Sequence, residues 1–86
     1  MIVAIVFSSD FQQSFTLECE DHSVWFVKVI RELDARHGDD WTTSGFNVID
    51  TLIEAYEQWA NGASPAMAED FDSEHPDSRM QILIYP

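Results

Sequence analysis

The stretch Ile2-Val-Ala-Ile-Val-Phe7 decides the fold of this chain of 86 residues. A continuous apolar run that is rich in β-branched side chains predicts a strand. A strand without polar alternation is typical of the buried middle of a sheet, and we place it there. The run is far shorter than the roughly 18 residues that a membrane span needs, and no basic segment marks a signal peptide. We therefore expect a cytoplasmic protein without a membrane partner.

Two further strands are predicted on either side of the helical part of the chain. Residues 14–20 alternate strictly, with Phe15, Leu17 and Cys19 on one side and polar side chains on the other. This pattern indicates a half-buried strand, and the short connection makes an antiparallel hairpin with residues 2–7. A last apolar strand is expected over residues 80–85.

Two helices are predicted between these strands. The first starts at a cap, Asp21 or Ser23, and runs to about His37, where Gly38 ends it. The second runs over about 46–60 and ends at Asn61-Gly62. Helical spacing gives each helix one apolar stripe toward the core. The expected stripes are Phe26, Val29, Ile30 and Leu33 in the first helix, and Ile49, Leu52, Ile53, Tyr56 and Trp59 in the second.

Residues 61–78 are expected to be irregular, with Ser64-Pro65 opening a short turn of helix. The order is therefore β-β-α-α-β over a single acidic domain, residues 1–86. This order predicts the α+β class, with a small antiparallel-rich sheet of about three strands and two helices packed on one face.

The net charge of −12, from 16 acidic and 4 basic residues, excludes direct binding to nucleic acid. Affinity for DNA or RNA depends on lysines and arginines that neutralise phosphates, and this chain would repel them. The same field speeds the encounter with a basic protein surface. We therefore expect the partner to be a basic protein surface, such as that of a nucleic-acid-binding protein or a nuclease.

The acidic residues concentrate outside the first helix. Asp50, Glu54 and Glu57 are spaced so that they share one side of the second helix. Further carboxylates follow at Glu69, Asp70, Asp72 and Glu74. Together these residues could imitate a row of phosphates; the alternatives are a solvated acidic face and adaptation to high salt.

Three aromatic residues, Phe11, Trp25 and Trp41, do not all fit in the predicted core. Trp41, in the connection between the helices, is a candidate interface anchor because exposed tryptophans beside charges often serve as one. The alternative is that these rings cover the ends of a small core.

Neither a metal site nor a catalytic site is predicted. Asp70-x-Asp72-x-Glu74 followed by Asp77 resembles a calcium loop, but it lacks the glycine and the bidentate glutamate of an EF-hand. His22, His37, His75 and Cys19 have no zinc-ligand spacing. Cys19 is expected to be a buried core residue because it lies on the apolar side of its strand. With no glycine-rich phosphate loop either, we expect no cofactor and no enzymatic activity.

In length and charge alone, the chain resembles the small acidic proteins with which phages and mobile elements block nucleic-acid-binding machinery of the host. These include DNA-mimic inhibitors of restriction, repair and CRISPR enzymes. The resemblance implies a non-enzymatic inhibitor that occupies a basic nucleic-acid-binding surface of another protein. Two alternatives stay open: an immunity protein or antitoxin that neutralises a basic toxin, and a structural or adaptor domain with incidental acidity. The oligomeric state is open as well.

Overall fold

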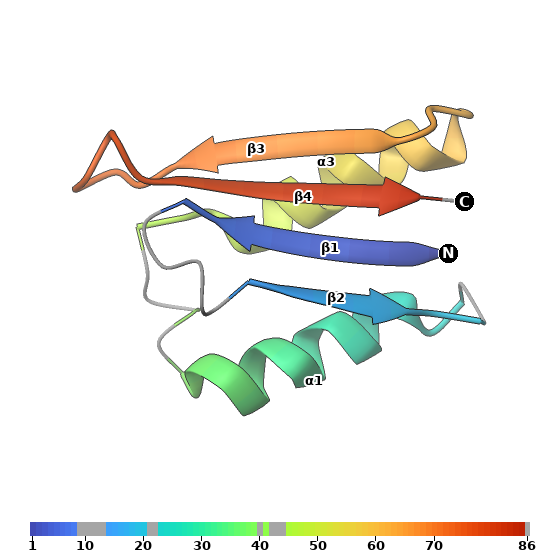
Figure 1. Cartoon of the computed structure of the whole chain (residues 1–86), viewed down its shortest axis with the longest axis horizontal. Coiled ribbons are helices and arrows are strands. Elements are labelled where there is room, and N and C mark those ends of the chain that lie inside the picture. The colour runs from blue at the N-terminus through green and yellow to red at the C-terminus, as the bar shows by residue number, and fades with distance from the viewer. Residues whose placement is uncertain (9–13, 21–22, 40, 42–44, 86) are drawn as a thin grey trace.

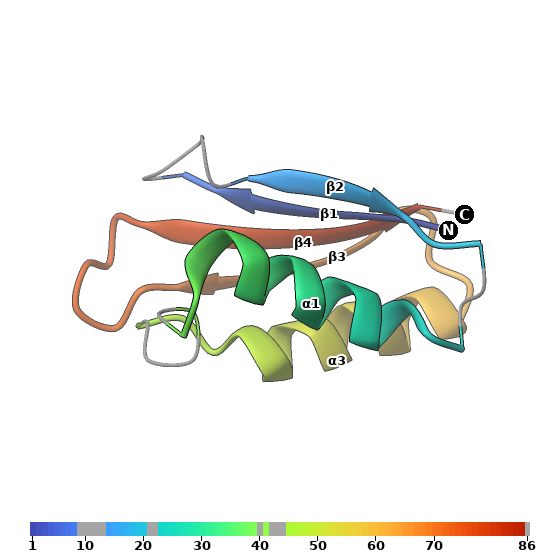
Figure 2. The same ribbon diagram turned by 90° about the horizontal axis from the view of Figure 1, so that it is seen from below.

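A computed structural model describes residues 1–8, 14–20, 23–39, 41 and 45–85. Its elements form two layers, with the helices side by side on one face of a sheet (Figures 1 and 2). The α+β class is confirmed. The predicted cap Asp21 and the side chains of Phe11 and His22 lie outside the described residues. The elements are β1 (Ile2–Phe7), β2 (Phe15–Glu18), α1 (Trp25–His37), α3 (Val48–Ala60), β3 (Ala66–Phe71) and β4 (Arg79–Tyr85).

The sheet has four strands in the order β2-β1-β4-β3, and every neighbouring pair is antiparallel. β1 lies inside the sheet, as its apolar character predicts, and Ile5 is paired with Phe15 on one side and Ile82 on the other. The hairpin of β1 with β2 is also confirmed. The predicted number of about three strands is wrong by one.

The additional strand is β3, which falls within the segment that the sequence predicts to be irregular. Alanine, glutamate and aspartate are uncommon in strands, so local preference gives little signal here. The strand forms because it pairs with β4 and because α3 covers it. Ala66 and Ala68 are buried, and their small side chains let α3 lie close to the sheet. Ser64-Pro65 precedes this strand with a cis peptide bond, where the sequence suggests a turn of helix.

The core lies between the sheet and the helices. Val3, Ile5, Ile82 and Ile84 of the two central strands are fully buried. Val29 and Leu33 of α1 and Leu52 of α3 meet them as predicted. Trp25 is also in the core, 5% exposed, and its ring stacks on Tyr56 of α3 with centroids 5.2 Å apart. The aromatic pair therefore joins the two helices, and Trp25 is not a surface anchor.

The helices end where the sequence predicts and begin later. Gly38 follows α1 with a φ of 58°, a left-handed conformation that glycine adopts without steric cost. α1 begins at Trp25, and its N-cap position is Val24, whose apolar side chain makes no capping hydrogen bond, so the cap lies one residue after the predicted Ser23. α3 begins after Asn47, whose side chain accepts a hydrogen bond from the Asp50 N–H.

β1 is covered on one face only. Its burial alternates, with Val3, Ile5 and Phe7 buried and Ile2, Ala4 and Val6 partly or largely exposed. The other face of β1 carries no helix, because both helices lie on the same side of the sheet, as predicted (Figure 2). Neither of the two described helices has the length and apolar character needed to cross a membrane.

Candidate functional site

The surface of α3 that faces solvent carries three carboxylates, Asp50, Glu54 and Glu57, which we call the α3 row. All three are exposed. The opposite side of the helix buries Val48, Leu52 and Ala55. A helix rises 1.5 Å per residue, so the members of the row follow one another at about 6 and 4.5 Å along the axis. The sequence prediction that they share one exposed side is consistent with this burial pattern.

Asn47 fixes the beginning of the α3 row. Its side-chain amide donates a hydrogen bond of 2.8 Å to Asp50 Oδ2, and its Oδ1 accepts the Asp50 N–H at 3.4 Å. Asp50 lies in the first turn of α3, where the helix dipole favours a negative charge. Glu54 and Glu57 have no ion-pair partner among the described residues, which include every lysine and arginine of the chain.

Asp70 and Asp72 have structural partners of their own. Asp70 Oδ2 accepts a hydrogen bond of 2.7 Å from the Asn47 N–H, which ties β3 to the beginning of α3. Asp72 Oδ1 accepts the N–H groups of Glu74 and His75 at 2.8 and 3.1 Å, and so shapes the turn before β4. Asp72 also packs against Gly45, where a Cβ atom would collide with its carboxylate. These two carboxylates are bound to backbone donors of the chain itself, so fewer of their lone pairs are free for a partner.

Glu69 and Glu74 lie away from the α3 row. Glu69 alternates with the buried Ala68 and so lies on the sheet face opposite the helices, where its Oε2 is 3.8 Å from Arg79 Nη1. Glu74 is exposed in the connection of β3 with β4. The structure therefore brings Asp50 and Asp70 together around Asn47 and does not gather all seven predicted acids in one patch.

Trp41 is partly buried and packs against the core. Its Nε1–H donates a hydrogen bond of 2.6 Å to Asp34 Oδ1 at the end of α1. It also lines a shallow hollow with Phe46 and Ile49 at the beginning of α3. The ring is thus held in place at the beginning of α3, where it forms part of the wall of that hollow.

Two exposed apolar residues of α3, Ile49 and Ile53, are not where the sequence places them. They are 37% and 44% exposed, whereas Val48, Thr51 and Ala55 are buried. The core-facing stripe is rotated because small residues, Thr51 and Ala55, lie against the sheet. Successive residues turn by 100°, so Ile49 and Ile53 border the α3 row on the side toward α1. Because isoleucine is apolar, the sequence pattern predicts that both residues belong to the core. The sequence also contains a second stripe at helical spacing, Val48, Thr51 and Ala55, which could have indicated the true core-facing side.

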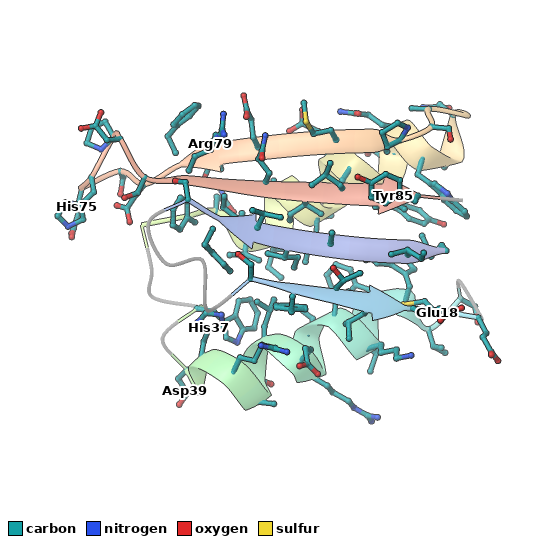
Figure 3. The ribbon with its side chains drawn as sticks, in the orientation of Figure 1. Glu18, His37, Asp39, His75, Arg79 and Tyr85 are labelled. Atoms are coloured by element: carbon teal, nitrogen blue, oxygen red, sulfur yellow. The ribbon has the colours of Figure 1, made fainter. Side chains whose placement is uncertain are left out.

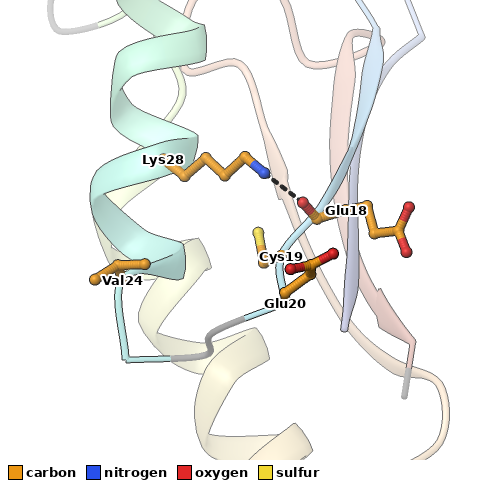
Figure 4. A pocket seen from close by; sticks show the side chains of 5 residues that line it. All are labelled: Glu18, Cys19, Glu20, Val24 and Lys28. Carbon is orange, nitrogen blue, oxygen red and sulfur yellow. Dashed lines mark hydrogen bonds between the residues drawn. The ribbon is translucent and has the colours of Figure 1, made fainter.

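A polar hollow lies where β2 meets α1 and is lined by Glu18, Cys19, Glu20, Val24 and Lys28 (Figure 4). Lys28 Nζ donates a hydrogen bond to the Glu18 carbonyl and closes one side of it. Cys19 is 2% exposed, so the prediction that it belongs to the core is confirmed. A buried thiol of this kind is inert in most proteins.

Metal-binding groups do not gather in the described part of the chain. No three histidine, cysteine, aspartate or glutamate side chains there are placed to hold an ion. Asp70 and Asp72 point to the different hydrogen-bond donors named above. Neither the protein-family models, nor the curated proteins, nor the solved structures contain a significant match to this chain.

Proposed function

We propose that this chain is a non-enzymatic inhibitor that binds a basic, nucleic-acid-binding surface of another protein through the α3 row. The observation that carries the proposal is that Glu54 and Glu57 are exposed without an ion-pair partner among the described residues. With Asp50 they form a line of negative charges on a rigid helix.

A line of carboxylates suits a surface that has evolved to hold phosphates. Arginine and lysine side chains bind carboxylate and phosphate oxygens with the same charge-assisted hydrogen bonds. The net charge of −12 would steer such a partner toward the chain, and salt would weaken this attraction. Uncompensated charge opposes folding by self-repulsion, which is a reason to attribute a function to it.

Apolar residues beside the α3 row would supply contact area that a charge row lacks. Ile53 and Ile49 border the row, and Trp41 lies at its first turn. Buried aromatic and aliphatic anchors contribute most of the binding energy in protein interfaces, while charges at the rim mainly set the association rate. We therefore assign the row to steering and orientation, and these three residues to affinity.

The α3 row replaces the longer set of predicted contacts. Asp70 and Asp72 would act indirectly, by holding the beginning of α3 and the neighbouring turn. Glu74 could touch a partner that extends past the first turn of α3, whereas Glu69 is on the opposite face of the sheet. We place this activity in the cytoplasm, where basic nucleic-acid-binding enzymes act.

The proposal is tested by capture of proteins from a cell lysate on the immobilised chain at low salt. Captured proteins are identified by mass spectrometry and then challenged with duplex DNA or RNA. We expect a nucleic-acid-binding protein that the duplex displaces. A captured toxin that kills cells when it is expressed alone would favour the immunity-protein or antitoxin alternative, which the same surface would serve.

Two variants with equal charge change locate the binding surface. Glu54→Lys with Glu57→Lys reverses the α3 row, and Glu20→Lys with Asp77→Lys reverses two exposed acids elsewhere. We expect the first variant to slow association with the captured protein by at least about tenfold at low salt, and the second to slow it far less. Equal slowing by both variants would show that net charge alone acts, and unchanged rates in both would remove the basis of the proposal.

A further inference from the structure

The sheet face that carries no helix is apolar in its middle. Residues of β1, β3 and β4 whose neighbours point into the core must point to this other face, because successive side chains alternate. No described element covers it (Figure 2). We call it the open face; its apolar members are Ile2, Ala4, Val6, Met67, Phe71, Leu83 and Tyr85.

The strand register makes these residues one continuous patch. Ile2 is opposite Tyr85, and Ala4 is opposite Leu83, which in turn is opposite Met67. Met67 is 45% exposed and Tyr85 39%. The patch therefore extends over the three strands β1, β4 and β3, and contiguous exposed apolar patches of a few hundred Å² often mark interaction sites.

The open face is also the least charged part of a strongly acidic molecule. Its charged residues within the described part of the chain are Glu18, Glu69 and Arg79, and the last two form an ion pair with each other. Glu18 is at the end of β2 and Arg79 is at the beginning of β4, at opposite corners of the face (Figure 3). The middle of the face thus has no charge, and its rim has two acids, Glu18 and Glu69, and one base, Arg79, which lies far from Glu18.

We propose that the open face is the interface of a homodimer, in which two copies pack sheet against sheet. Another copy is the occupant that the charges favour. A two-fold axis between the sheets can place Glu18 of each copy over Arg79 of the other, and the rest of the −12 charge stays on the outer surfaces. A basic partner or a nucleic acid would gain little here, because the face offers neither a row of acids nor a basic patch.

The size of the face fits a dimer that assembles reversibly. The four strands have six, four, six and seven residues, and at about 4.8 Å between strands they cover on the order of 400 Å². Two such faces cover on the order of 800 Å², and side-chain relief brings the buried area close to the roughly 1,000 Å² that is the lower limit for a specific interface. We therefore expect dissociation in the micromolar range.

Sedimentation equilibrium of the purified chain between about 1 and 500 µM tests the proposal without any other protein. We expect the mass to rise from 9.9 kDa toward twice that value. Leu83→Lys, at the centre of the open face, should raise the dissociation constant at least tenfold, although it lowers the net negative charge. Met67→Lys, at an exposed position, tests the same prediction should Leu83→Lys fail to fold by circular dichroism. Val27→Lys on α1, 50% exposed, is the matched control and should leave the dimer intact.

A charge exchange tests the arrangement of the two copies. Glu18→Arg and Arg79→Glu should each weaken the dimer, and the double variant should restore it. A chain that stays monomeric at every concentration overturns the proposal. So does a dimer that Val27→Lys dissociates and the two open-face variants do not. The α3 row lies on the far side of each copy, so this result is independent of the test of partner binding.

Discussion

α1 and α3 have equal lengths and lie on the same sheet face, yet they differ in charge and in how they end. Each has 13 residues. α1 carries Lys28, Arg31 and Arg36 against Glu32 and Asp34, whereas α3 carries three acids and no base. α3 has a capping side chain and an acid in its first turn; α1 has neither, but it has Arg36 and His37 in its last turn.

Because of this difference, side-chain charges interact favourably with the helix dipoles at one end of the helix layer and not at the other. The helices run in opposite directions, so the end of α1 and the beginning of α3 lie at the same end of the molecule (Figure 1). Both termini there have the charge that the helix dipole favours. At the other end, α1 begins without a cap and α3 ends near Glu57. Of the charges that the proposed function uses, Asp50 thus stabilises the fold, whereas Glu57 does not.

The largest effect is expected where the two helices do not differ, which is in the core. Leu33 of α1 and Leu52 of α3 are both 0% exposed. Leu33→Ala and Leu52→Ala should each lower the free energy of unfolding by about 2–5 kcal/mol, through lost burial and a cavity. Urea denaturation followed by circular dichroism measures both. A much smaller cost for Leu33→Ala would mean that α1 is only peripherally attached to the fold.

A smaller effect should separate the two helix beginnings. Asn47→Ala removes the cap of α3 and the amide that holds Asp50, which should cost about 1 kcal/mol. Asn47→Ser keeps a capping oxygen and should lose less. Val24→Ala, at the same position of α1, removes no cap and should stay within about 0.5 kcal/mol of the wild type. Equal losses for Asn47→Ala and Val24→Ala in thermal unfolding would refute the distinction.

A third pair of variants should have effects of opposite sign. Glu32→Gln removes the partner of Arg36, whose Nε is 2.7 Å from Glu32 Oε1, and should cost a few tenths of a kcal/mol. Glu57→Gln removes an acid from the last turn of α3 and should add roughly the same amount of stability. Thermal unfolding at low and at high salt should show both differences shrink as salt is added. If Glu57→Gln destabilises the chain, Glu57 has a stabilising contact that its exposed position does not suggest.

In the last comparison we expect no effect: neither helix should bind DNA or RNA. We expect no nucleic-acid binding by the basic residues of α1, because Glu32 pairs with Arg36 and Lys28 donates a hydrogen bond to the Glu18 carbonyl. Fluorescence anisotropy with labelled duplex DNA and with RNA should show no binding at physiological salt. A micromolar, sequence-independent change would contradict this prediction and would shift the candidate surface from α3 to α1.

Much of the fold could be predicted because its signals are local. Each signal spans only a few neighbouring residues: the alternation around Phe15, the apolar run of β1 and the glycine after α1. β3 was not, since Ala66 and Glu69 have no strand preference and depend on pairing with β4. The candidate site was predicted in part. Helical spacing indicated the α3 row, but no local rule could show that Asp70 binds Asn47, 23 residues away.

The sequence by itself determined the charge, the α+β class, the internal position of β1 and the alignment of Asp50, Glu54 and Glu57. These follow from composition and from periodicities of two and 3.6 residues, which are properties of neighbours along the chain. The tertiary structure alone decided which apolar residues are covered. Ile53 and Leu83 are as apolar as residues of the core, and they remain accessible because both helices pack on one face of the sheet and bury their smaller residues against it. Burial depends on what lies opposite a side chain in space, and sequence periodicity does not contain that information.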